Sequence, residues 1–449
     1  MRKYILTLLV LHIVSIGFTQ EETTKTQSFT LQEAIEFALE NNYSAINADR
    51  DLIDAKKQKW ETIATGLPQI TGGVSYQNQL KQPVSVIPAE IFGGEPGTFA
   101  EVVFGQPQSA NAVATLTQQI FDGSYIVGVQ ATKAFLSYSE NTTEKTDLEV
   151  RKAVTKAYGN VLLAEESVYI FQKNKKNLEK NVFETTKIYE NGLGDEEGVE
   201  QLQITLASVD NQLKNAIRLK AITLQMLNLV MGIEIDAQTL LSENLDQLAE
   251  NQVDFDLLES DFNIENNVDF KLATNLNEQR YFEWKLAKSR ALPTLNAFIN
   301  YGTSGFADDF NFLSSDQQWF DSSVLGFDLS IPIFSSGKRR ASTARAKIAL
   351  EKAKTQLTEA QEQIRLQLES AKSNYVLAIE QYETAKSNLN LAERIENKNQ
   401  IKYNEGIASS FELRQAQTQL YVTQSSYLQS MVEVINKKTE LETIINNKS

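Results

Sequence analysis

The chain has 449 residues, with 43 Lys and Arg against 58 Asp and Glu, so its net charge is −15. Such a charge repels phosphate backbones and argues against a nucleic-acid partner. Cysteine is absent, which excludes a disulfide-stapled scaffold, and the one histidine, His12, stands near the start. Without thiol and imidazole groups beyond that point, we expect no catalytic residues, no metal site and no cofactor.

The N-terminus has the layout of a signal peptide. Arg2 and Lys3 give a short basic start, and an apolar run extends to Phe18. This run is shorter than the roughly 20 residues of a spanning helix, so a membrane anchor is the weaker alternative. We expect residues 1–20 to direct export and to be removed. No later stretch has about 18 uninterrupted apolar residues, so any membrane-spanning part would consist of strands.

The remaining sequence contains the same order of features twice. Each half has an Asn-Asn pair, a Leu-Pro pair and a Tyr-x-x-Gly turn, and these matches begin at Asn41 and Asn266, Leu67 and Leu292, and Tyr189 and Tyr403. A repeated order of this kind indicates internal duplication. We predict two structural repeats, residues 21–231 and 232–449.

Each repeat is predicted to contain two strands followed by two very long helices. The strands are expected at about 68–121 and 293–334, and the helices at about 122–231 and 335–446. Residues 108–292 and 333–449 contain no proline, the residue that most strongly breaks a helix. The helices carry apolar residues at a spacing of seven, which indicates coiled-coil packing. In the last helix this stripe consists of Leu413, Leu420, Tyr427, Val434 and Leu441.

The strand segments alternate between apolar and mostly polar residues. In one of them Ile70, Val74 and Tyr76 alternate with Gln69, Thr71 and Ser75. This period fits a transmembrane β-strand, but a half-buried sheet of a soluble protein has the same alternation. The long helices favour the membrane interpretation. Four strands cannot close a barrel, so several chains must contribute, with two copies as the formal minimum and three giving twelve strands.

These features together resemble the TolC-type outer membrane efflux proteins. The resemblance rests on the signal peptide, the early helix from Phe29 to Asn42, the two Leu-Pro strand entries and the two Tyr-x-x-Gly turns, and it covers essentially the whole mature chain. Each motif is weak alone, whereas their duplicated order is specific. The expected fold is mainly α with a β-barrel part: a long α-helical barrel in the periplasm, and four transmembrane strands per chain.

The resemblance implies a homotrimer with a twelve-stranded barrel in the outer membrane and an extension into the periplasm. Members of this family serve tripartite efflux or type I secretion as passive exit ducts. Their partners are a periplasmic adaptor and an inner-membrane transporter, which supplies the energy, and they are not enzymes. A periplasmic coiled-coil adaptor or scaffold without a barrel is the alternative, but an adaptor normally has one helical hairpin and compact β-domains.

The two predicted turns between long helices are the candidate functional site. Gly192 and Gly406 are expected to adopt positive φ where a helix ends, which by itself explains their presence. In the family these tips contact the adaptor and close the periplasmic entrance. The resemblance therefore implies that Leu193 and Ile407 are exposed apolar contacts.

The family's periplasmic gate is only partly matched. Tyr403 and Glu412 stand where a gate tyrosine and a ring carboxylate are expected, but Ala408 replaces the basic gate residue and Gln415 replaces the second acid. An acidic collar of Glu412 with Glu196 and Glu197 is one interpretation, and a solvated acidic helix end is the other.

Two further features leave alternatives open. Trp60 and Trp284 precede the strand entries, where they suit either an interfacial aromatic belt or core packing. The segment 83–107 either caps the extracellular mouth or is a surface loop without a role.

Overall fold

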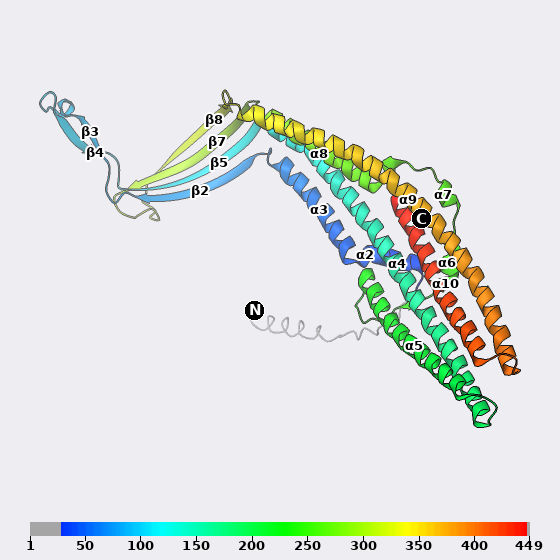
Figure 1. Ribbon diagram of the computed structural model, residues 1–449. Coiled ribbons are helices and arrows are strands. Elements are labelled where there is room, and N and C mark those ends of the chain that lie inside the picture. Colours follow the sequence, from blue (N-terminus) through cyan, green and yellow to red (C-terminus); the bar gives the residue numbers. More distant parts are fainter. Residues whose placement is uncertain (1–27, 447–449) are drawn as a thin grey trace, which may run out of the picture. The chain divides into compact units, whose positions relative to one another are not determined.

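The computed structural model describes residues 28–446 and is shown in Figure 1. The predicted signal peptide at residues 1–20 lies outside this range. The chain forms two compact units: one contains the chain up to Arg50, Thr142–Phe270 and the chain from Gln361 on, and the other contains Asp51–Asn141 and Lys271–Ala360. Each unit combines segments from both halves of the sequence, and the division into repeats 21–231 and 232–449 stays a prediction. Four helices pass from one unit into the other: α3 (Tyr43–Ala64), α4 (Gly123–Glu190), α8 (Val268–Ser289) and α9 (Lys338–Asn404).

The unit formed by residues 51–141 and 271–360 contains a four-stranded antiparallel sheet in the order β2–β5–β7–β8. Its central pair joins the two halves of the sequence, because β5 pairs with β7 from Gln108–Ala307 to Asp122–Thr294. The outer strands β2 and β8 each have one neighbour within the described chain, so each leaves one edge unpaired. The strands are β2 (Gln69–Asn78), β5 (Gln108–Asp122), β7 (Thr294–Ala307) and β8 (Trp319–Ser330).

The strand register places the predicted apolar residues on one face of this sheet. One row across all four strands consists of Ile70, Leu116, Ile299 and Leu325. The next row, on the opposite face, consists of Thr71, Thr115, Asn300 and Val324. Ile70 and Leu325 are 74% and 66% exposed, so this apolar face has little cover from the described chain. The alternation seen in the sequence is therefore confirmed as a two-faced sheet.

The segment between β2 and β5 forms a second, smaller sheet. Strand β3 (Val84–Pro88) pairs with β4 (Phe99–Val103), and the 3-10 helix η1 (Ala89–Phe92) follows β3. The prediction of two strands in the first repeat is therefore incomplete. Val and Phe residues in both flanks of this segment favour extended pairing despite its Pro and Gly content. The role of the segment 83–107 stays a prediction.

The other unit is helical, and its helices pack through the predicted heptad stripes. In α10 (Ser410–Ile445), Leu413, Val434 and Leu441 are fully buried. Val434 and Leu441 belong to a core that also contains Tyr375 of α9 and residues of α4 and α5 (Glu196–Met231). Full burial of each large apolar side chain contributes on the order of 2 kcal/mol. Across residues 28–446, no helix combines the length and apolar composition needed to cross a bilayer.

Short elements cover the middle of this helical unit. They are β1 (Ser28–Phe29), α2 (Leu31–Asn41), β6 (Leu240–Leu241), α6 (Leu245–Asn251), α7 (Asp256–Glu259) and the 3-10 helix η2 (Ile264–Asn266). Two buried tyrosines fix these elements to the long helices. The hydroxyl of Tyr158 donates to the carbonyl of Phe29 at 3.0 Å, and that of Tyr375 donates to the carbonyl of Gln252 at 2.6 Å. The α4–α5 and α9–α10 hairpins are thus each bonded to the short elements at this level.

Candidate functional site: the tips of the helical hairpins

The two hairpin turns have the same backbone geometry. Gly192 and Gly406 have φ of 72° and 73°, a conformation in which a Cβ is unfavourable. Each glycine amide donates to the carbonyl three residues earlier, at 2.8 and 3.0 Å, and the amide of the next residue donates to the carbonyl five residues earlier, at 3.1 and 2.8 Å. These bonds form a Schellman motif, which satisfies the last carbonyls of α4 and α9.

An exposed apolar side chain follows each of these glycines. Leu193 is 81% exposed and Ile407 is 71% exposed. The two tips are neighbours, since a Cβ on Gly198 at the start of α5 would lie 2.9 Å from the hydroxyl of Ser410 at the start of α10. Figure 1 shows both hairpins ending at this side. The structure therefore leaves both predicted contact residues exposed, on tips whose following helices α5 and α10 begin side by side.

The acidic residues of the site lie in the first turns of α5 and α10. Glu196 and Glu197 are exposed and follow Asp195, the N-cap residue of α5. Glu412 forms a capping box with Ser409: its carboxylate accepts the Ser409 amide at 2.8 Å and the hydroxyl at 3.0 Å. These bonds, the backbone one first, hold the pKa of Glu412 below its usual value. Each carboxylate is thus stabilised by a helix N-terminus, independently of any collar.

Tyr403 connects the two hairpins. Its hydroxyl hydrogen-bonds the hydroxyl of Thr185, which is buried on α4. Two amide pairs lie further along α4. In the partly buried pair, Asn181 Nδ2 donates to Gln400 Oε1 of α9 at 3.0 Å, and in the buried pair, Asn174 Nδ2 donates to Gln424 Oε1 of α10 at 2.9 Å. We call these three pairs the polar ladder. The structure thus gives the predicted gate tyrosine a partner in the neighbouring hairpin.

Sequence reasoning missed the rest of this ladder. A signal was present, because Asn174 and Asn181 are seven residues apart and therefore share one heptad position on α4. Gln417 and Gln424 likewise follow the heptad residues Leu413 and Leu420 by four. Amides at such positions introduce hydrogen-bonding requirements into a helix contact that would otherwise be apolar.

A partly buried carboxyl group, that of Glu396, lies beside the ladder, between α9 and α10. Burial raises the pKa of Glu396, and a side-chain hydrogen bond with Gln417 lowers it by less. Gln417 is 1% exposed, and its Oε1 has no hydrogen-bond partner among the described residues. Burial also raises the pKa of Tyr421, which Glu396 raises further. The contact between these helices near the tip is therefore polar and incompletely satisfied.

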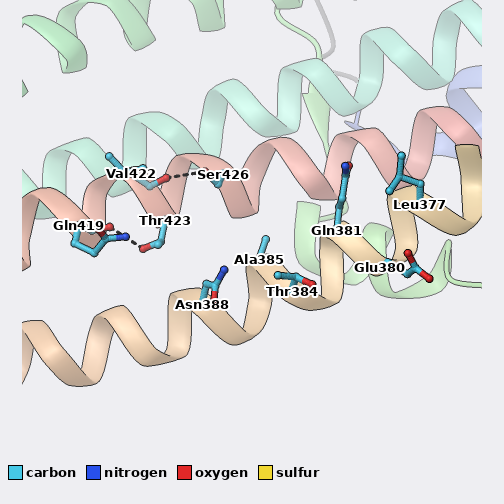
Figure 2. Close-up of a pocket in the computed structure, with 10 residues that line it drawn as sticks. All are labelled: Leu377, Glu380, Gln381, Thr384, Ala385, Asn388, Gln419, Val422, Thr423 and Ser426. Carbon is cyan, nitrogen blue, oxygen red and sulfur yellow. Dashed lines mark hydrogen bonds between the residues drawn. The ribbon is translucent and has the colours of Figure 1, made fainter.

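An open groove runs between α9 and α10 further from the tip, and Figure 2 shows the side chains that line it. It measures about 500 Å³ and is lined by small and polar residues, among them Thr384 and Ala385 of α9 and Thr423 and Ser426 of α10. Small side chains on facing helices leave space for a further helix to approach. The described residues contain no group of three His, Cys, Asp or Glu that would hold a metal ion.

Comparison with known proteins connects this geometry to a family. Residues 264–447 match the family model described as outer membrane efflux protein. No curated protein sequence matches the chain significantly.

Several solved structures share the fold over nearly all of the chain. The outer membrane protein VceC of Vibrio cholerae has a TM-score of 0.71 at 16% identity, covering 92% of this chain and 95% of VceC. The CmeC outer membrane channel of Campylobacter jejuni has a TM-score of 0.72 at 16% identity, covering 96% and 90%. The MtrE outer membrane channel of Neisseria gonorrhoeae has a TM-score of 0.71 at 17% identity, covering 92% and 88%. The helix-rich TolC-like fold is thus confirmed, and with the family match in its second half the chain is identified as resembling the TolC-like outer membrane efflux proteins.

Proposed function

We propose that this chain is one protomer of an outer membrane exit duct. The observation that carries the proposal is the sheet, which has two unpaired edges and one continuous, exposed apolar face. Open edges are not tolerated in lipid, so other copies of the sheet must pair with β2 and β8. Three copies give the twelve strands that the resemblance implies.

The helices are proposed to continue this duct through the periplasm. The 68 residues of α4 span about 100 Å at 1.5 Å per residue, which far exceeds the needs of a globular core. The duct is passive and not an enzyme. An inner-membrane transporter and a periplasmic adaptor supply energy and substrate, in tripartite efflux or in type I secretion.

The hairpin tips are proposed to contact the adaptor and to form the gate. Leu193 and Ile407 present apolar side chains on neighbouring tips, and the groove between α9 and α10 offers a surface for an adaptor helix. The polar ladder, including Tyr403, holds the hairpins together with bonds that water can replace when they separate. Glu412, Glu196 and Glu197 place negative charge at the entrance, where it favours cations.

The test is single-channel conductance of the detergent-purified protein in planar bilayers, together with the oligomeric mass of the same sample. We expect discrete conductance from a heat-sensitive trimer. A protein that extracts without detergent and gives no conductance would contradict the duct and favour a periplasmic scaffold.

A further inference from the structure

The four junctions between helices and strands form one continuous band. The hydroxyl of Tyr125 in α4 donates at 3.0 Å to a carbonyl in the last turn of α3. Next, the hydroxyls of Ser124 in α4 and Ser289 in α8 lie 3.3 Å apart, and the hydroxyl of Thr343 in α9 donates to the carbonyl of Ala287 in α8 at 3.4 Å. The helix ends therefore follow the same order as the strands to which they lead.

This band carries a charge opposite to that of the whole chain. The junction segments 56–68, 122–131, 281–293 and 331–347 contain eleven Lys and Arg but only three Asp and Glu, whereas the complete sequence has a net charge of −15. We call these segments the basic collar. A local excess of this size attracts anions within about one Debye length, about 8 Å at physiological ionic strength.

The cations of the basic collar form no ion pairs with the described residues. Elsewhere in the helices lysines pair closely with acids, as in Lys145–Asp269 at 2.8 Å and Lys175–Asp210 at 2.6 Å. Among the described residues, by contrast, no acidic side chain forms an ion pair with a collar cation. Arg339 instead donates to two backbone carbonyls of the link between β8 and α9. The collar thus retains its capacity to bind an external anion.

Exposed aromatic side chains accompany the charges. Trp60 is 61% exposed, so it does not pack in the core of this chain. On α8, Lys285 Nζ lies 4.7 Å from the ring centre of Tyr281, and Lys288 Nζ lies 5.7 Å from that of Trp284. Aromatic rings with adjacent cations suit a membrane interface, where ring and cation both meet the lipid headgroups.

We propose that the basic collar binds anionic phospholipid headgroups, in the leaflet that faces the helices. The proposal rests on membrane insertion of the sheet, which is part of the proposed function. Along each of three junctions a large apolar or aromatic residue next to the strand (Leu67, Leu292 or Phe334) comes before the collar cations. Clusters of four to eight Lys and Arg beside a membrane segment recognise anionic lipids. An acidic protein partner would account for the cations but not for the adjoining apolar face of the sheet.

The three tryptophans of the chain provide the assay, since Trp60 and Trp284 lie in the collar and Trp319 begins β8 at the far end of the sheet. A Trp319→Phe protein retains only the collar reporters. It is reconstituted in mixed vesicles of phosphatidylglycerol and phosphatidylcholine in which either the first or the second lipid is brominated. We expect bromine on phosphatidylglycerol to quench at least about threefold more per bromine than bromine on phosphatidylcholine. High salt should reduce the difference.

The test variant replaces four collar cations with Gln: Lys57→Gln, Lys285→Gln, Lys288→Gln and Arg340→Gln. Its quenching ratio should fall to about one, because the charges that enrich the anionic lipid are removed. The matched control loses four exposed lysines elsewhere and should keep the wild-type ratio: Lys173→Gln, Lys176→Gln, Lys352→Gln and Lys398→Gln.

Two outcomes overturn the proposal, and they are distinguishable. Equal quenching by both lipids in a protein that forms conducting channels contradicts lipid selectivity and leaves the duct intact. Absence of quenching by either lipid, together with absence of conductance, contradicts membrane insertion and with it the proposed function. A Trp60→Phe, Trp284→Phe protein, which retains Trp319, should show no preference for either lipid.

Discussion

The bond between Tyr403 and Thr185 gives the most direct test of a gate held by the polar ladder. Tyr403→Phe removes the hydroxyl that reaches across from α9 to α4 and leaves the ring in place. Thr185 is buried, so water cannot freely replace the lost partner. Such a bond contributes about 1 kcal/mol net, or about 3 kcal/mol over three copies of the chain. That sum corresponds to a change of about 150-fold in the equilibrium between closed and open tips.

Two measurements check this magnitude. In planar bilayers, Tyr403→Phe channels should spend a much larger fraction of time in the fully open state. In a double-mutant cycle of thermal stability, Tyr403→Phe and Thr185→Val should show a coupling energy of about 1 kcal/mol per chain. The matched control is Tyr189→Phe, which changes the corresponding tyrosine of the other hairpin. Tyr189 is 40% exposed, and its hydroxyl forms no hydrogen bond with the described residues.

The reasoning fails if the coupling energy lies below about 0.3 kcal/mol, the usual limit for independent sites. It also fails if Tyr403→Phe and Tyr189→Phe channels have the same open fraction. Either result would show that the hydroxyl pair does not hold the hairpins together.

Three further predictions concern the tips. Gly406→Ala should destabilise the turn by about 1 kcal/mol because alanine is strained at φ of 73°. Calorimetry should show a lower Tm for this variant, whereas Gly→Ala at a glycine with negative φ should not lower the Tm in this way. Glu412→Gln should reduce cation selectivity in reversal-potential measurements. The folded pKa of Glu412 lies below its unfolded value, so its stabilising bond to Ser409 is present at neutral pH and is lost as the pH falls through the folded pKa. The Tm difference between variant and wild type should therefore shrink in acid. Glu396→Gln should raise the Tm at pH 7, because burial raises the folded pKa of this carboxyl and its ionised form destabilises the fold at neutral pH. This gain in Tm should disappear below the unfolded pKa, and a gain that persists there would contradict the explanation.

Much of this architecture follows from local patterns in the sequence. The absence of proline and the heptad spacing predicted the long helices, and α4 ends at Glu190, within the Tyr-x-x-Gly turn that the sequence predicted. Alternation of apolar and polar residues predicted two-faced strands. The two glycines predicted the turns. Helix periodicity, strand periodicity and positive φ are properties of a few neighbouring residues, so they are recorded in the sequence directly.

Tertiary structure decided which of these elements meet. The pairing of β5 with β7 joins strands from opposite halves of the chain and leaves β2 and β8 as edges, and no local pattern specifies that order. The partner of Tyr403 and the amide pairs depend on the contact of α4 with α9 and α10. The unpaired state of the collar cations likewise depends on which acids lie within reach. Such interactions are set by distances between residues remote in sequence, and these are determined only when the helices and strands pack.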